Sequence, residues 1–252
     1  MKHWLIGICL ILATTTTYSQ KNKKNKKVDD APVVNHDQAM EKLINQTGDV
    51  NMMLYHLYEK AAKDSTDMET LEQIAYIYLL QQKYGYCINV SQIILKNDPA
   101  HITALEILAS AYQGSNQKEK AIITYQKLLG YQEHPKTHYQ LATLYFETGN
   151  DVGCQEYLNK VLNDTTSKNH SVIINFQDAN QQLKKQEVNL IAACYNIVGF
   201  LYLKNEQVEE AKRYFNAAVQ IAPNFVLPKG NLQMIQNAEQ KAAEEAAKKD
   251  ND

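Results

Sequence analysis

Two histidines stand four residues apart in the stretch HPKTH, at positions 134 and 138. On one face of a helix this spacing could hold a metal ion, because side chains four apart are neighbours there. Pro135, however, favours the first turn of a helix, since it lacks an N–H and its φ is already helical. His134 then lies outside the helix, so we expect no metal site here and no cofactor elsewhere.

Other catalytic chemistry also lacks its residues. Carboxylate pairs such as Glu209 and Glu210 fall on solvated faces of predicted helices. No Ser, Cys or Thr has a neighbouring base that would activate it as a nucleophile. Gly149 and Gly153 belong to a predicted turn between helices and do not form a phosphate-binding loop. We therefore expect a protein that is not an enzyme.

The first 20 residues, MKHWLIGICLILATTTTYSQ, have the pattern of an export signal. The apolar run from Trp4 to Ala13 is shorter than the roughly 20 residues that span a bilayer, although an uncleaved anchor is the alternative. Small residues place the cleavage near Ser19 and Gln20. The sequence predicts an exported, periplasmic protein with no integral membrane segment after cleavage. The lysine-rich stretch KNKKNKKVDDAPVV that follows predicts a basic linker that buries no core.

Composition limits the class of partner and fold. The chain has 252 residues and a net charge of -2, and this near-neutral balance argues against nucleic acid as a ligand. Only 9 Gly and 5 Pro are present, which is few for a β-sandwich with many tight turns. The length suits either one sizeable core or a stack of small units.

Four stretches share one pattern, in which a small residue is followed three positions later by tyrosine. They are LEQIAYIY (71–78), LEILASAY (105–112), HYQLATLY (138–145) and YNIVGFLY (195–202). The step between tyrosines is 34 residues from Tyr78 to Tyr112, 33 to Tyr145 and 57 to Tyr202. The last step is one period plus an insertion, so the chain is an array of similar units.

The second half of each unit repeats as well. A small residue follows the turn each time, at Cys87, Ala121, Cys154 and Ala211, and three units close with Pro99, Pro135 and Pro223. Small residues on both halves allow two helices to approach closely, and proline ends the second helix. Two of the cysteines therefore have a packing role two repeats apart, too far for a disulfide.

The period and the order of apolar, small, aromatic, small, aromatic and Pro resemble the tetratricopeptide repeat family, most fully at 102–135 and 192–225. The resemblance, to exported Bacteroidota-type periplasmic proteins of this family, implies an all-α, right-handed superhelical solenoid of antiparallel helix hairpins. We divide the chain into a signal peptide (1–19), a basic linker (20–35), a degenerate helical hairpin (36–67) broken near Gly48, repeats (68–101, 102–135, 135–168 and 192–225), an insertion with a helix extension (169–191), and a capping helix with a polar tail (226–252).

The family also implies a binding groove lined by the first helix of each hairpin. Carried over to this chain, its positions are Glu69, Glu72 and Tyr76, then Glu106, Ser110 and Gln113, then Tyr139, Thr143 and Phe146, and last Asn196, Phe200 and Lys204. This surface is acidic at its N-terminal end and aromatic in the middle, which suits a peptide or protein segment. The family's Lys/Asn clamp for a peptide's terminal carboxylate is missing. The alternative for the aromatic residues is packing against a neighbouring helix or the insertion.

The insertion departs from the repeat pattern. The stretch SVIINF is β-branched and has no helical period. Asp178 suits a helix N-cap and Gln181 the capping-box position, so we expect the first helix of the last repeat to start near Ala179. The remainder is either a surface loop or a segment, 170–177, that folds over the stack or contacts a partner.

Together these features favour a non-enzymatic protein–protein interaction scaffold of the bacterial cell envelope, which binds another protein or peptide in its groove. One alternative is a subunit or assembly factor of an envelope or secretion machine. The other is a carbohydrate-binding protein, because a polar and aromatic groove could hold a sugar. No feature of the sequence indicates the oligomeric state.

Overall fold

The computed structural model describes residues 36–178 and 180–249, so the predicted signal peptide and basic linker lie outside the described residues. The chain divides into two compact units, Met1–Gln46 and Thr47–Asp252. Helix α1 (His36–Thr47) lies in the first unit except for its last residue. Gly48, with φ 65°, separates it from α2 (Val50–Lys63), which confirms the predicted helix break.

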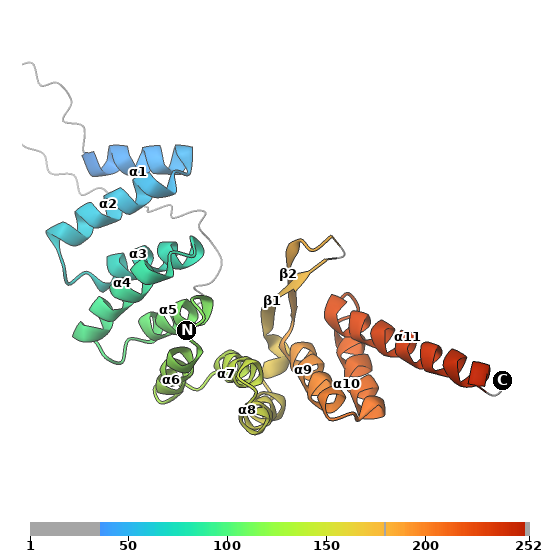
Figure 1. Ribbon diagram of the computed structural model, residues 1–252. Coiled ribbons are helices and arrows are strands. Elements are labelled where there is room, and N and C mark those ends of the chain that lie inside the picture. Colours follow the sequence, from blue (N-terminus) through green and yellow to red (C-terminus); the bar gives the residue numbers. More distant parts are fainter. Residues whose placement is uncertain (1–35, 179, 250–252) are drawn as a thin grey trace, which may run out of the picture. The chain divides into compact units, whose positions relative to one another are not determined.

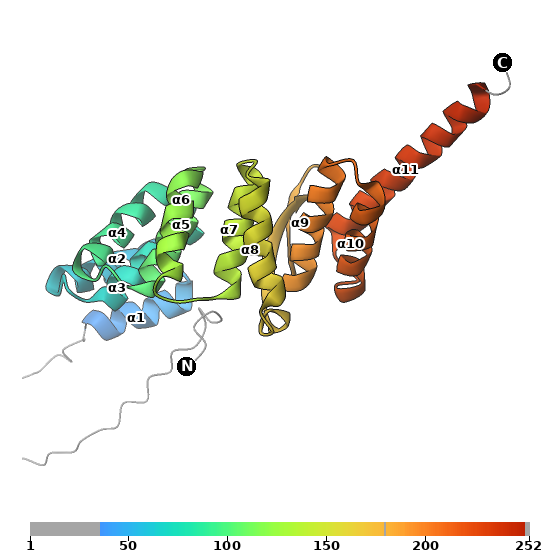
Figure 2. The ribbon, with the colours of Figure 1, turned by 90° about the horizontal axis from the view of Figure 1, so that it is seen from below.

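The second unit is built from consecutive helix hairpins (Figures 1 and 2). They are α3 (Met68–Leu80) with α4 (Tyr84–Asn97), α5 (Ile102–Gly114) with α6 (Lys118–Leu129), α7 (Pro135–Glu147) with α8 (Asp151–Asn163), and α9 (Leu190–Lys204) with α10 (Val208–Ile221). Each hairpin packs against the next: α4 contacts α5, α6 contacts α7, and α8 contacts α9. The solenoid of helix hairpins predicted from the sequence is confirmed.

All four hairpins turn in the same way. One residue at the turn has a positive φ: Gln82 (58°), Asn116 (60°), Gly149 (76°) or Glu206 (60°). The next residue donates its N–H to the carbonyl oxygen of the repeated tyrosine, over 2.8 to 3.0 Å. This is the Schellman arrangement that closes a helix C-terminus. The recurring tyrosine therefore marks the end of each first helix.

Small residues allow the two helices of a hairpin to touch, as predicted. Ala75, Ala109 and Ala142 are fully buried, and a Cβ added to Gly199 would lie 2.5 Å from the Phe215 ring of α10. The three described cysteines, Cys87, Cys154 and Cys194, are free and buried. The predicted packing role of Cys87 and Cys154 is confirmed.

The insertion forms a β-hairpin, and the predicted helix extension from Ala179 is wrong. Strand β1 (Ser171–Gln177) pairs antiparallel with β2 (Leu183–Asn189), after the short helix η1 (Ser167–Asn169). Asp178 does use its side chain to cap backbone N–H groups, but these belong to Asn180 and Gln182 in the β-turn. The same side-chain chemistry serves both helix N-caps and Asx turns, so the residue could not distinguish them. Helix α9 starts only at Leu190.

The last helix, α11 (Val226–Lys249), packs on α10 and continues past it (Figure 2). Asn231 and Ile235 are buried, whereas residues 236–246 are exposed. An apolar first half and a solvated second half are expected where a helical stack ends. Among the described residues, no helix is both long and apolar enough to cross a membrane.

Candidate functional site

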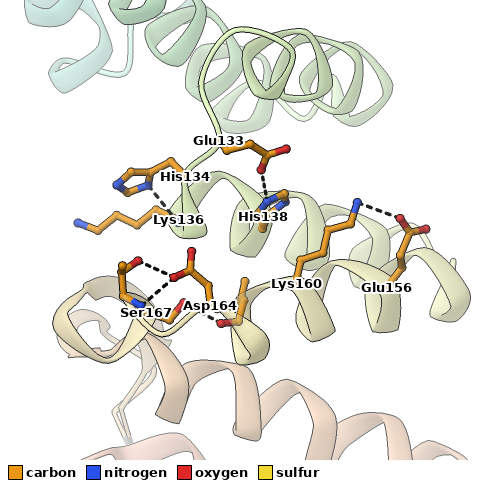
Figure 3. Close-up of polar contacts among 10 residues, drawn as sticks. Glu133, His134, Lys136, His138, Glu156, Lys160, Asp164 and Ser167 are labelled. Atoms are coloured by element: carbon orange, nitrogen blue, oxygen red, sulfur yellow. Dashed lines mark hydrogen bonds and ion pairs between the residues drawn. The ribbon is translucent and has the colours of Figure 1, made fainter.

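The histidines of the HPKTH stretch lie at the start of α7 (Figure 3). His134 is the N-cap, and its Nδ1 accepts a hydrogen bond from the N–H of Lys136 at 3.2 Å. His138 is buried and contacts Glu133 through Nε2 at 2.5 Å. Helix α7 starts at Pro135, so His134 is outside it, as predicted. Within residues 36–178 and 180–249, no three His, Cys, Asp or Glu side chains are placed to hold a metal ion.

The twelve predicted groove residues differ in exposure. Glu69, Tyr76, Glu106 and Lys204 are exposed; Glu72, Ser110, Gln113, Thr143, Phe146 and Phe200 are half-buried; Tyr139 and Asn196 are buried. The exposed members at the N-terminal end come from α3 and α5, the first helices of the first two repeats. A partner could therefore reach the predicted surface mainly on these two helices.

Carboxylates on α3 and α5 interact with a basic residue at the start of the next first helix. Glu72 on α3 lies 3.0 Å from Nε2 of His101, the N-cap of α5. One repeat later, Glu106 on α5 interacts electrostatically with Lys136 in the first turn of α7. An acidic residue on one first helix thus faces a basic residue at the start of the next in both repeats, although only Glu72 forms a close ion pair. Part of each carboxylate stays open to solvent.

These two carboxylates are partly desolvated by the surrounding helices. Desolvation raises the pKa of Glu72, opposed by the attraction of His101. Desolvation likewise raises the pKa of Glu106, opposed by Lys136. Because an incompletely neutralised carboxylate gains from a further cation, both residues would interact favourably with a basic group of a partner.

Two predicted groove residues on α5 bond within their own hairpin. The Ser110 hydroxyl lies 3.3 Å from the hydroxyl of Tyr125 on α6, which also donates to Gln113 Oε1 at 3.3 Å. Tyr125 is buried, and burial raises its pKa to about 12. Ser110 and Gln113 therefore satisfy a buried phenol and have less capacity to bond a partner.

Tyr139 and Asn196 do not lie on an open surface, contrary to what their groove positions implied. Tyr139 packs in the core cluster that includes Cys154 and Cys194, and burial raises the pKa of its phenol. Asn196 accepts a 3.2 Å hydrogen bond from Nδ2 of Asn231 on α11. Helix α11 thus covers Asn196, as a further repeat would.

The other C-terminal positions also form internal contacts. The rings of Phe146 and Phe200 are 6.1 Å apart, between α7 and α9. For this pair, the structure agrees with the alternative that the aromatic residues pack against a neighbouring helix and do not line a groove. Lys204 is directed at α8, where its Nζ lies 2.7 Å from a carboxylate oxygen of Asp151. Thr143 donates to the backbone carbonyl of Tyr139.

Four of the predicted residues, Glu69, Glu72, Tyr76 and Glu106, form a partly exposed surface, here named the α3–α5 surface. Glu69 and Glu72 lie one turn apart on α3, and Tyr76 follows a further turn along with 37% of its side chain exposed. Spacings of three and four residues place all three on one side of the helix. Acidic groups beside an exposed aromatic ring suit a basic, partly apolar protein segment.

Sequence reasoning missed the exposed face of the β-hairpin. Val172 and Val188 pack against the stack, whereas Ile173 and Leu183 are each 67% exposed. The run of β-branched residues in SVIINFQ, which ends in alternating polar and apolar residues, is the sequence signal that could have revealed the strand. Segment 170–177 does fold onto the stack, which was one of its two predicted alternatives.

Comparisons with known proteins agree with this architecture. The tetratricopeptide repeat profile matches residues 192–225 and 102–134. No curated protein sequence matches the chain. The crystal structure of MamA has a TM-score of 0.57 at 18% identity, covering 71% of this chain and 91% of MamA. A double mutant of MamA RS-1 has a TM-score of 0.58 at 14% identity, covering 73% and 92%.

At such low identity the likeness to MamA concerns the fold. The profile matches fall on the hairpins α5–α6 and α9–α10, whose turns and small-residue contacts recur in the other two hairpins. Stacked hairpins of this kind present extended surfaces to other proteins. Two segments of the chain thus match the tetratricopeptide repeat, and they lie in a stack of four hairpins that share the same turn.

Proposed function

We propose that the protein is a non-enzymatic scaffold whose α3–α5 surface binds a basic segment of a partner protein. The observation that carries the proposal is the pair of partly desolvated carboxylates, Glu72 and Glu106, beside exposed Glu69 and Tyr76. Lysine or arginine of a partner would bring a further positive charge to these two carboxylates. Tyr76 would supply rigid apolar contact area.

Affinity purification from the native envelope, followed by quantitative mass spectrometry, tests this surface. The test variant carries Glu69→Gln, Tyr76→Ala and Glu106→Gln. The control carries Glu119→Gln and Ile123→Ala on α6, where both side chains are exposed. Loss of a central tyrosine and two charges should weaken binding at least about tenfold, so partners recovered with the control should be depleted from the test variant.

Salt gives a second measurement on the same complex. Binding that depends on exposed carboxylates should weaken as ionic strength rises, because salt screens exposed charges. Equal recovery with both variants, at unchanged helicity, would refute the α3–α5 surface. Recovery of the protein alone, with affinity for glycans, would favour the carbohydrate-binding alternative.

We also propose that the scaffold works in the periplasm of a bacterium. The support is the sequence of residues 1–19, with its short apolar run followed by small residues. The N-terminus of the protein isolated from the envelope fraction should be Gln20. A chain that retains Met1 or residues 1–19 in that fraction would contradict the proposed cleavage.

A further inference from the structure

The two-stranded sheet has two outer edges, and its register shows which backbone groups lie on each. The N–H of Leu190 donates to His170 at 2.9 Å, and the N–H of Asp178 donates to Gln182 at 3.0 Å. Bonded pairs alternate along an antiparallel ladder, so the even-numbered residues of β1 exchange bonds with β2. The odd-numbered residues therefore direct their N–H and C=O groups away from β2; they are Ser171, Ile173, Asn175 and Gln177.

This outer edge of β1 has no partner within the described chain. Among residues 36–178 and 180–249, no group beyond the sheet bonds to the backbone of these four residues. Ile173, Asn175 and Gln177 are also exposed through their side chains. Unpaired backbone groups on a strand edge form a ready template for another strand.

The two edges of the sheet differ in charge. Strand β1, SVIINFQ, contains no charged residue and no proline, whereas β2 contains Lys184, Lys185 and Glu187. Lysine and proline are the residues with which proteins commonly block an edge against other strands. The Gln186 side chain further ties β2 to the start of α11, bonding Asn224 O and Val226 N. Only β1 therefore has the composition of a strand that accepts another.

We propose that β1 pairs antiparallel with β1 of a second copy of this chain, about a two-fold axis at Ile174. In this register each odd-numbered residue meets an odd-numbered one: Ile173 bonds Asn175 of the second copy, and Ser171 bonds Gln177 of the second copy. All outward backbone groups of β1 are then paired. A continuous four-stranded sheet results.

The side chains favour a second copy as the occupant. On the face toward the stack, Val172 would lie opposite Phe176 of the second copy, and Ile174 opposite its own counterpart. Cross-strand pairs of apolar and aromatic residues stabilise a sheet. Because β1 carries no charge, no like charges lie opposite each other between the two β1 strands. The interface uses no residue of the α3–α5 surface, so each proposal can fail without the other.

Proline substitutions test the pairing by sedimentation or light scattering over a concentration series. Asn175→Pro removes an outward N–H and leaves the bonds between β1 and β2 in place. Its matched control is Lys185→Pro, because Lys185 lies directly opposite Asn175 and directs its N–H to the other edge. Two net hydrogen bonds are lost per dimer, so Asn175→Pro should weaken self-association roughly thirtyfold. Lys185→Pro should leave self-association unchanged.

Amide exchange gives a second measurement that does not depend on a variant. As concentration rises, the N–H groups of Ile173 and Asn175 should become protected, while those of Val172 and Ile174 are protected throughout. A wild-type protein that stays monomeric at high concentration overturns the proposal. So does equal weakening by the two prolines. Protection of Ile173 and Asn175 at every concentration would show that another segment or a copurified protein covers the edge, and would also overturn it.

Discussion

Replacing Gly149 with alanine should destabilise the second unit through the backbone alone. Gly149 has φ 76° in the turn between α7 and α8, and no atom lies within 4 Å of a Cβ added there. The added methyl group meets no neighbour, so the cost is that of holding an L-residue in the left-handed region, roughly 1–2 kcal/mol. The same turn in the last repeat is held by Glu206, so Glu206→Gly should have the opposite sign.

The gain from Glu206→Gly should be about 1 kcal/mol or less, because glycine also gives the unfolded chain more freedom. For a chain of this size 1 kcal/mol shifts Tm by about 2–4 °C. Thermal and urea unfolding followed by circular dichroism would measure both variants. Gly230→Ala in α11 is the control: it has equal space and a helical backbone, so alanine should be tolerated or stabilising there. Gly149→Ala as stable as the parent, or Glu206→Gly less stable, would refute the backbone argument.

Three further outcomes are expected. Gly199→Ala should lower Tm, since its methyl would lie 2.5 Å from the Phe215 ring, an overpacking cost of about 1–3 kcal/mol; an unchanged Tm would mean that the ring moves aside freely. Burial is the largest cause that lowers the pKa of His134 in the folded protein, followed by the charges of His170 and Lys136. Neutral His134 therefore contributes to the free energy of unfolding above the ordinary histidine pKa of about 6.5, and this contribution should be lost as pH falls through the lower folded pKa. His134→Asn keeps an N-cap but cannot titrate, so its urea midpoint should depend less on pH in that range. Burial raises the pKa of Cys87 to about 11, so alkylation at pH 8 should be slow in the folded protein and fast in denaturant.

The position of a residue on a first helix could be predicted where it depends only on the residue's own hairpin and the next one. Glu72 and Glu106 occupy the same place in successive repeats, and each interacts electrostatically with a basic residue at the start of the following first helix. A periodic sequence places such residues equivalently. Tyr139 and Asn196 occupy equally periodic positions, yet both are buried. Tyr139 packs in the core cluster that includes Cys194, and Asn196 bonds to Asn231 of α11.

The β-hairpin could not be separated from a helix extension by its local signals. Asp178 caps the β-turn with side-chain bonds to backbone N–H groups. Bonds of the same kind would cap a helix that started near Ala179. What decided the outcome is the pairing of β1 with β2 and the burial of Val172 and Val188 against the stack. Both are contacts between residues distant in sequence.

The sequence by itself determined the array: its period, its helix breaks and the small residues where helices meet. These features repeat because every hairpin faces the same neighbour, so one local pattern specifies one local packing. The tertiary structure decided which side chains stay open. Exposure depends on what the ends of the array and the insertion cover, and α11 and the β-hairpin occur once each, outside the period.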